Sequence, residues 1–170
     1  MIKAIAFDWG NTIMREIPLT RRPSAHSPSV EVVPGVTEAL KALHRQYLCC
    51  VASNAHGPES TALGLVLERV GLEKYVQQVF TAEELKAQKP DAKFFSGLLL
   101  KLKLQPSECV MVGDDYQTDI VGAKTAGLKT VWFTNQTNRD APHADVVIST
   151  MDQLSPAIAK LSGQREHVVI

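Results

Sequence analysis

The protein has 170 residues, of which 45% are hydrophobic, and its 18 basic and 18 acidic side chains balance to a formal charge of zero. This length and composition predict a single domain, residues 1–170, with one well-filled hydrophobic core. Because positive charge is not in excess, neither nucleic acid nor a membrane surface is expected as a partner. The first apolar stretch is too short for a signal sequence, and no stretch approaches the roughly 20 apolar residues of a spanning helix. We therefore expect a soluble, cytoplasmic protein.

In chain order, short β-rich runs alternate with longer segments in which apolar residues recur at helical spacing. Strands are predicted over residues 2–7, 48–53, 76–80, 109–112, 130–133 and 146–148. Helices are predicted over about 36–46, 59–70, 92–102, 118–126 and 151–161. A helix-length segment separates each strand from the next, except for the last two. This alternation predicts an α/β fold, a doubly wound Rossmann-like three-layer sandwich with a central, mostly parallel sheet and a ligand site at the carboxyl ends of the strands.

Residues 14–34 interrupt this alternation. They include three prolines before Pro34 and three serines, and their apolar residues show no period, which predicts an irregular excursion above the edge of the sheet. Arg21, Arg22 and His26 in this segment are either contacts for a second anionic group of a substrate or part of a solvated polar loop.

The three cysteines, Cys49, Cys50 and Cys109, lie in apolar, strand-like runs. Their odd number and their surroundings favour reduced, buried side chains. A disulfide framework or a zinc site matches this pattern less well.

Polar residues follow the first two predicted strands. Asp8 ends the first strand, where its carboxylate can attack a substrate, bind a metal or simply cap the following turn. Ser53 and Asn54 end the second strand, which brings a hydroxyl group and unpaired backbone N–H groups to the same edge. Such groups are donors for phosphate oxygens.

A lysine and an acidic cluster follow later in the chain. Lys89 lies just before a predicted helix, from where its ammonium group can reach the same edge, although on its own it would be an ordinary surface lysine. Asp114, Asp115 and Asp119 lie at the end of the fourth strand and the start of the next helix. Clustered carboxylates are the ligands that Mg²⁺ prefers, and the alternative is an acid-rich helix start that interacts with the helix dipole.

Taken together, these residues resemble the haloacid dehalogenase superfamily of hydrolases, over nearly the whole chain from residue 2 to about 148. Its four signatures occur in the family's order, each at a predicted strand end or helix start. The matching residues are Asp8 with Thr12, then Ser53, then Lys89, and finally Gly113 and Asp114 with Asp119. Any one signature is weak, but four in register are a strong signal.

The resemblance implies a Mg²⁺-dependent phosphohydrolase that acts through an aspartyl-phosphate intermediate. Asp8 would attack phosphorus, Ser53 and Lys89 would neutralise charge on the phosphoryl oxygens, and water would hydrolyse the acyl phosphate. On the same resemblance, the direct metal ligands are Asp8, the main-chain carbonyl of Gly10 and Asp114, with Asp119 or Asp115 acting directly or through water. Thr12, Asn54 and His56 are expected on the substrate side of the site.

One position departs from the family. Phosphatases of the superfamily carry a second aspartate two residues after the nucleophile, as general acid and base, and this chain has Gly10 there. The first explanation is a phosphatase that is slow or selective for good leaving groups, with the acid role taken by water, His56 or a group from residues 14–34. The second is dehalogenase-like or phosphonatase-like hydrolysis. The third is a binding or regulatory module without turnover.

No cap domain is expected over the site. About 20 residues occupy the first slot in which family members insert a cap, and the 36 positions from Ser53 to Lys89 (89 − 53) are filled by a predicted helix, a strand and their loops. An open site admits a phosphorylated substrate that is large or macromolecular, or it is roofed by a second copy in a homo-oligomer.

Overall fold

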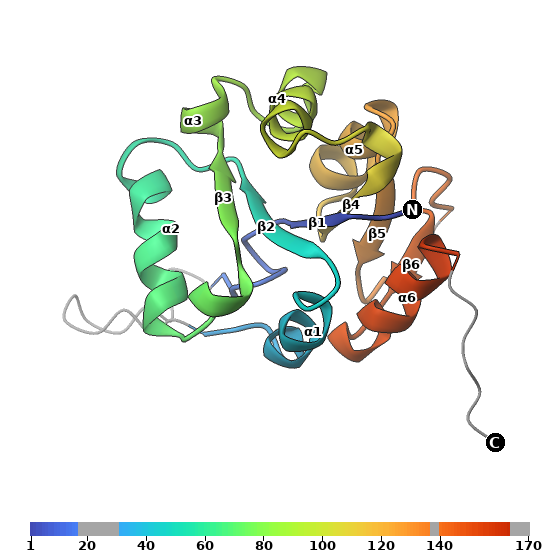
Figure 1. The fold of residues 1–170 in the computed structure, drawn as a ribbon, viewed down its shortest axis with the longest axis horizontal. Helices are drawn as coiled ribbons and strands as arrows, with labels where there is room; N and C mark the ends of the chain where they lie inside the picture. The colour runs from blue at the N-terminus through green and yellow to red at the C-terminus, as the bar shows by residue number, and fades with distance from the viewer. Residues whose placement is uncertain (17–30, 137–139, 164–170) are drawn as a thin grey trace.

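The computed structural model describes residues 1–16, 31–136 and 140–163. Its strands are β1 (Ala4–Phe7), β2 (Leu48–Ser53), β3 (Gln78–Thr81), β4 (Cys109–Gly113), β5 (Lys129–Phe133) and β6 (Val146–Ile148). They form one sheet in the order β3-β2-β1-β4-β5-β6, and every pair is parallel (Figure 1). Because the chain winds outward from β1 in both directions, the predicted doubly wound α/β fold is confirmed.

The predicted helices are present, with small changes at their ends. The helices are α1 (Val36–Leu43), α2 (Gly57–Arg69), α3 (Ala82–Leu85), α4 (Ala92–Leu102), α5 (Gly122–Thr125) and α6 (Leu154–Leu161). Short helical turns are η2 (Glu73–Tyr75), η3 (Pro106–Glu108) and η5 (Met151–Gln153), and a π-helical segment, η4 (Tyr116–Val121), leads directly into α5. The four-residue helix α3 was not predicted, because it is too short to show a helical period.

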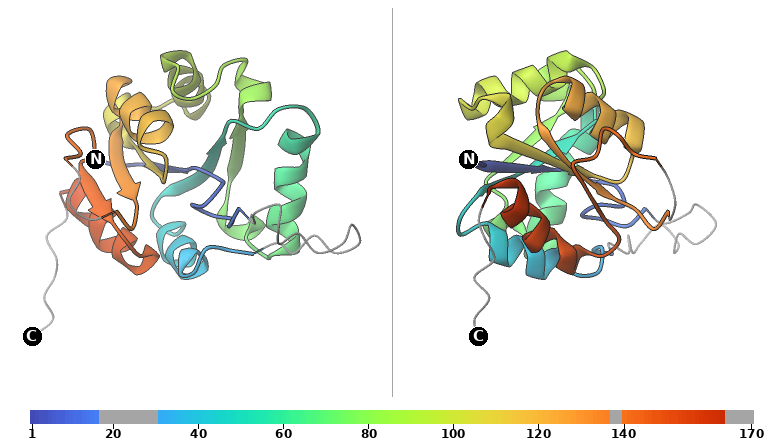
Figure 2. Two further views of the ribbon diagram at one scale, coloured as in Figure 1. Left: turned by 180° about the vertical axis from the view of Figure 1, so that it is seen from behind. Right: turned by 90° about the vertical axis from the view of Figure 1, so that its right-hand side faces the viewer.

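Side chains of β1, β2 and β4 alternate between two hydrophobic cores. Ile5 and Phe7 of β1 pack in the layer that contains α1, α2 and α6, whereas Ala4 and Ala6 face the layer that contains α4 and α5. The small residues on the second side leave room for the fully buried Phe94 of α4. The views from behind and from the side show the two helical layers on either side of the sheet (Figure 2).

The two ends of the predicted excursion, 14–34, are paired with each other. The N–H of Arg15 donates to the carbonyl of Glu31 at 2.8 Å, and the N–H of Val33 donates to the carbonyl of Ile13 at 2.8 Å. These bonds hold the described ends beside the carboxyl end of β1. The predicted substrate contacts of this segment, Arg21, Arg22 and His26, lie outside the described residues.

The cysteines are free and buried, as predicted. Burial raises the pKa of Cys49 and Cys109 to about 12, so both stay protonated thiols near neutral pH. Among the described residues, no helix is both long enough and apolar enough to cross a membrane.

Candidate active site

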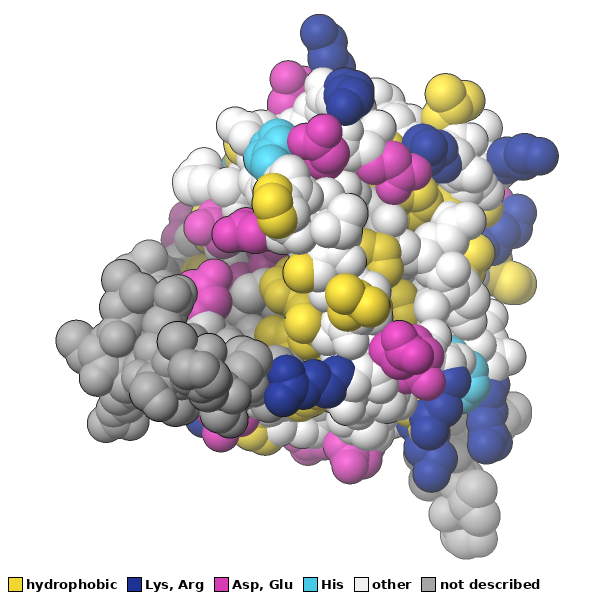
Figure 3. Space-filling model, turned by 90° about the vertical axis from the view of Figure 1, so that its left-hand side faces the viewer, with side chains coloured by type: hydrophobic (Ala, Val, Ile, Leu, Met, Phe, Trp, Pro, Cys, Tyr) yellow, Lys and Arg dark blue, Asp and Glu magenta, His cyan; other side chains and the backbone are white. Residues whose placement is uncertain are grey.

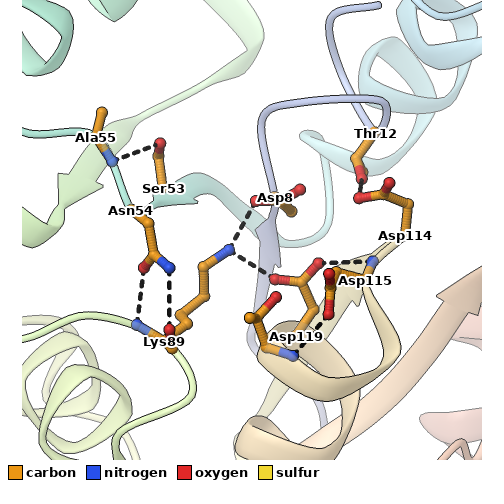
Figure 4. Close-up of polar contacts among 10 residues, drawn as sticks. Asp8, Thr12, Ser53, Asn54, Ala55, Lys89, Asp114, Asp115 and Asp119 are labelled. Carbon is orange, nitrogen blue, oxygen red and sulfur yellow. Dashed lines mark hydrogen bonds and ion pairs between the residues drawn. The ribbon is translucent and has the colours of Figure 1, made fainter. Parts of the chain in front are cut away.

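The carboxyl end of β1 lies between the carboxyl ends of β2 and β4. Phe7 is in register with Val51 on one side and with Val112 on the other, so Asp8 emerges between the ends of two neighbouring strands. The predicted strand-end residues therefore lie in one group, which also includes Lys89 from the loop before α4 (Figure 4). This edge of a doubly wound sheet is where ligands of such folds bind.

Lys89 is the central cation of this group. Its Nζ lies 2.7 Å from Asp8 Oδ1 and 2.7 Å from Asp119 Oδ1, and the residue is only 3% exposed. Burial lowers the pKa of Lys89, but the carboxylates of Asp119 and Asp8 outweigh that effect and hold this pKa above its ordinary value. Lys89 is therefore a fixed, positively charged group beside the predicted nucleophile.

Asn54 holds the backbone of Lys89 in place. Its Nδ2 donates to the Lys89 carbonyl at 2.9 Å, and its Oδ1 accepts the Lys89 N–H at 2.7 Å. This reciprocal pair ties the loop before α4 to the end of β2. Asn54, predicted as a substrate contact, thus positions Lys89 in the structure. Asn54 also lines the cavity beside Asp8.

Three carboxylates lie close together, and Lys89 contacts two of them. Asp8, Asp114 and Asp119 each place one oxygen within 4.8 Å of the others. Burial, followed by the nearby Asp8 carboxylate, raises the pKa of Asp114 to about 7. One lysine does not balance three clustered acids, so the site retains negative charge.

This donor set fits a divalent metal ion. Carboxylate oxygens are hard ligands of the kind that Mg²⁺ prefers, and the uncompensated charge favours a cation. Asp119 already uses Oδ1 for Lys89 and Oδ2 to accept the Asp115 N–H at 3.2 Å. Asp8 and Asp114 are therefore the residues best placed to hold a metal directly.

The Asp115 carboxylate has a different task. Its Oδ1 accepts the N–H of Thr118 at 2.8 Å, which caps the first turn of η4. It does not belong to the group of three clustered acids. The alternative explanation of an acidic helix start therefore applies to Asp115, while its neighbour Asp114 joins the cluster.

Gly113 makes room for the buried acid. A Cβ atom at this position would overlap the Oδ2, Cγ and Cβ atoms of Asp119. The glycine of the Gly113-Asp114 pair is thus required by close packing, since any side chain would displace Asp119 from Lys89.

Two hydroxyl groups also lie in this group. Ser53 Oγ accepts the N–H of Ala55 at 3.1 Å, so its own hydrogen is available for a phosphate oxygen. Thr12 is fully buried, and its hydroxyl donates to Asp114 Oδ1 at 3.5 Å. Ser53 is thus oriented for a ligand, whereas Thr12 supports an acidic residue of the cluster.

His56, predicted on the substrate side of the site, lies apart from the acidic cluster. The His56 ring is 3.7 Å from Glu83 and lines a depression formed with α3 residues, outside the described lining of the cavity at Asp8.

Trp132 was not predicted as a residue of the site. Its Nε1 donates to the Asp114 carbonyl at 2.9 Å and thereby holds the end of β4. The signal for Trp132 was its place near the end of β5, opposite Gly113 in the parallel register.

A cavity of about 760 Å³ opens beside Asp8. Its lining combines acidic residues with hydrophobic residues of α2. Its described lining is Asp8, Trp9, Gly10, Asn11, Met14, Arg15, Glu16, Glu31, Ser53, Asn54, Ala55, Glu59, Ala62, Leu63, Val66, Asp114 and Asp115. On the side of the molecule where α2 lies, acidic and hydrophobic side chains lie next to each other (Figure 3). The described residues include no cap domain, since α2, η2, β3 and α3 account for the chain between Ser53 and Lys89.

Comparisons with known proteins show which family and which relatives this chain resembles. A family model described as haloacid dehalogenase-like hydrolase matches residues 11–133. The ribulose-1,5-bisphosphate 5-phosphatase of Halopiger xanaduensis is 34% identical over 148 residues, which cover 80% of this chain and 60% of that protein. The glyceraldehyde 3-phosphate phosphatase of Pyrococcus furiosus is 29% identical over 142 residues, 80% of this chain and 58% of that protein. The chain thus spans about 60% of the length of these curated relatives.

A solved structure shares the fold. The crystal structure of an uncharacterized protein from Listeria monocytogenes serotype 4b superposes with a TM-score of 0.80 at 25% sequence identity. The match covers 95% of this chain and 99% of that chain. The sheet and its helical layers are therefore common to both proteins.

Proposed function

Because the chain belongs to the haloacid dehalogenase-like hydrolases, we propose that it is a Mg²⁺-dependent phosphatase in which Asp8 is the nucleophile. The observation that carries this proposal is the contact of Asp8 with the buried Lys89 beside the acidic cluster. Phosphoryl transfer needs an in-line nucleophile and cancellation of charge on the phosphoryl oxygens. A carboxylate, a fixed lysine and a metal-binding acidic cluster supply these elements.

In the proposed reaction, Lys89 keeps Oδ1 of Asp8 in place, and a carboxylate oxygen of Asp8 attacks phosphorus. The hydroxyl of Ser53 and the ammonium of Lys89 donate to the phosphoryl oxygens. Asp8 and Asp114 would hold Mg²⁺ directly, with the main-chain carbonyl of Gly10 as a further ligand and Asp119 acting through water, and the ion would supply charge neutralisation at the phosphoryl group. Release of the alcohol leaves an acyl phosphate on Asp8, which water hydrolyses.

The proposed substrates are small phosphorylated molecules. The names of the two curated relatives refer to ribulose-1,5-bisphosphate and glyceraldehyde 3-phosphate. A cavity of about 760 Å³ is in the range of pockets for small molecules. A macromolecular substrate and a homo-oligomer that roofs the site stay predictions, and the relatives' names give them no support.

The test is hydrolysis of p-nitrophenyl phosphate, acetyl phosphate and glyceraldehyde 3-phosphate, with Mg²⁺ and with EDTA. Wild type is expected to act only with the metal, and Asp8→Asn is expected to lose at least about a thousandfold, as for other removed nucleophiles. Asp140→Asn removes an exposed carboxylate outside the described lining of the cavity and serves as the control. No turnover of any of the three substrates by the folded wild type would exclude the phosphatase and favour a binding module.

A further inference from the structure

A carboxylate lies in the space beside Gly10 where a side chain at position 10 would be. A Cβ atom on Gly10 would lie 2.5 Å from Oε1 of Glu16 and 3.2 Å from its Cδ. The carboxylate of Glu16 therefore occupies the space in which a short acidic side chain at position 10 would lie. This proximity comes from the chain folding back after β1, since the two residues are six positions apart.

Hydrogen bonds hold Glu16 against this turn. Its N–H donates to Asn11 Oδ1 at 3.0 Å, and Asn11 Nδ2 donates to Glu16 Oε2 at 3.4 Å. Asn11 has a left-handed backbone with φ of 54°, a conformation that asparagine tolerates better than most residues. The N–H of Asn11 also bonds the Met14 carbonyl at 2.6 Å, which closes the loop that returns Glu16 to Gly10.

Glu16 shares a cavity with the predicted nucleophile. Asp8, Gly10 and Glu16 all line the same hollow, together with Ser53. Glu16 is exposed, so solvent reaches its carboxyl group. His56, the other acid considered for this role, lines a different depression and lies beside Glu83.

We propose that Glu16 is the general acid and base of the reaction at Asp8, in the place of the side chain that Gly10 lacks. This inference rests on the proposed phosphatase function. In the first step a carboxylate oxygen of Asp8 bonds to phosphorus, the bond from phosphorus to the ester oxygen breaks, and protonated Glu16 gives its proton to that oxygen. In the second step ionised Glu16 takes a proton from water, whose oxygen bonds to phosphorus while the bond to Asp8 breaks. The products are the alcohol and inorganic phosphate, and both carboxyl groups return to their starting states.

The experiment compares Glu16→Gln with wild type on two esters that differ in their leaving groups. An alkyl phosphate such as glycerol phosphate needs a proton on its departing oxygen, whereas p-nitrophenolate leaves without one. Glu16→Gln is expected to lower glycerol phosphate turnover by about 10²–10⁴-fold. With p-nitrophenyl phosphate it is expected to release about one p-nitrophenol per enzyme in a burst and then slow, because the base for the second step is missing. Glutamine can still accept the Asn11 amide hydrogen bond, so the turn is preserved.

Glu31→Gln is the matched control. Glu31 lines the same cavity at the other end of the excursion and pairs with Arg15 at 3.6 Å. This variant is expected to keep the wild-type ratio of rates for the two esters and to show no burst. If Glu16→Gln behaves like Glu31→Gln while wild type is active, the role of Glu16 is refuted and the phosphatase proposal stands. If wild type forms no acyl phosphate and turns over neither ester, both proposals fail.

A transplanted aspartate provides a second readout. Gly10→Asp in the Glu16→Ala background is expected to recover at least about tenfold of the glycerol phosphate rate, because a carboxylate returns to the space that Glu16 vacates. An equal loss on both esters in Glu16→Gln, without recovery by Gly10→Asp, would overturn the catalytic role and leave Glu16 as part of the turn only.

Discussion

At the scale of single residues, the buried Lys89 contributes both to the stability of the fold and to the position of the predicted nucleophile. Its ammonium group contacts two carboxylates, and the side chains of Lys89 and Asp119 are 2% and 1% exposed. A buried charge is tolerated only with such partners. The same contacts that hold the nucleophile therefore also compensate the buried charge of Lys89.

Lys89→Met is expected to lower the free energy of unfolding by about 3–5 kcal/mol, because it leaves Asp8 and Asp119 without their cation. The measurement is urea unfolding in EDTA. Lys101→Met breaks a surface pair of equal length, 2.7 Å from Glu84, in which both side chains are more than 40% exposed. That control is expected to lose less than about 1 kcal/mol. Equal losses of unfolding free energy in Lys89→Met and Lys101→Met would show that the buried contacts of Lys89 contribute no more than an exposed ion pair.

Gly113→Ala is expected to separate Asp119 from Lys89, because the new Cβ would overlap the Asp119 carboxylate. We expect a loss of roughly 1–3 kcal/mol from overpacking and a fall in phosphatase activity. Unfolding by urea and hydrolysis of p-nitrophenyl phosphate measure the two effects. Wild-type stability and wild-type activity in Gly113→Ala would mean that the Asp119 side chain can move away from the new Cβ atom without consequence.

At the scale of elements, two glycines in and just after α2 have opposite conformational requirements. Gly64 lies within the helix with open space around its missing Cβ, whereas Gly71 follows the helix with φ of 71°. A helical interior disfavours glycine, but the left-handed residue after a helix favours it.

Gly64→Ala is therefore expected to raise the free energy of unfolding by about 0.5–1 kcal/mol. Gly71→Ala is expected to lower it by roughly 1–2 kcal/mol, although its Cβ also meets nothing within 4 Å, because alanine resists the left-handed conformation. Thermal unfolding of both variants measures whether each substitution raises or lowers the free energy of unfolding. Changes of the same sign would contradict this account of the helix end.

The sequence predicted the elements well because periodicity is local. All six strands and the long helices follow from the alternation of apolar residues, and α4 spans the predicted residues 92–102. The errors lie at ends and short turns. The third strand begins at Gln78 and not at residue 76, because η2 and its following residues occupy the chain before it. The π-helical form of η4 has no period that distinguishes it from an α-helix.

At the scale of the whole molecule, the formal charge is zero, yet the carboxyl edge of the sheet concentrates acids. Sheet order causes this, because parallel strands deliver their ends to one edge. That residues 1–170 form one domain stays a prediction, since parts of the chain lie outside the described residues.

Mg²⁺ is expected to stabilise the folded protein, by about 2.7 kcal/mol at a concentration one hundred times its Kd. Thermal unfolding of wild type and Asp114→Asn, each in EDTA and in Mg²⁺, measures the effect. Asp114→Asn is expected to lose most of the gain from Mg²⁺. In EDTA it is expected to be at least as stable as wild type, because burial and the Asp8 carboxylate disfavour a charge on Asp114. An undiminished gain in the variant would argue against Asp114 as a metal ligand.

The sequence by itself determined the order of elements, the parallel sheet and the strand ends that carry Asp8, Ser53 and Asp114. These depend on local periodicity and on the rule that parallel strands end together. Only the tertiary structure decided that Asn54 clamps Lys89, that Asp115 is a helix cap and that Glu16 lies over Gly10. Such contacts depend on side-chain reach and on the path of loops, which act across the sheet edge and leave no period in the chain.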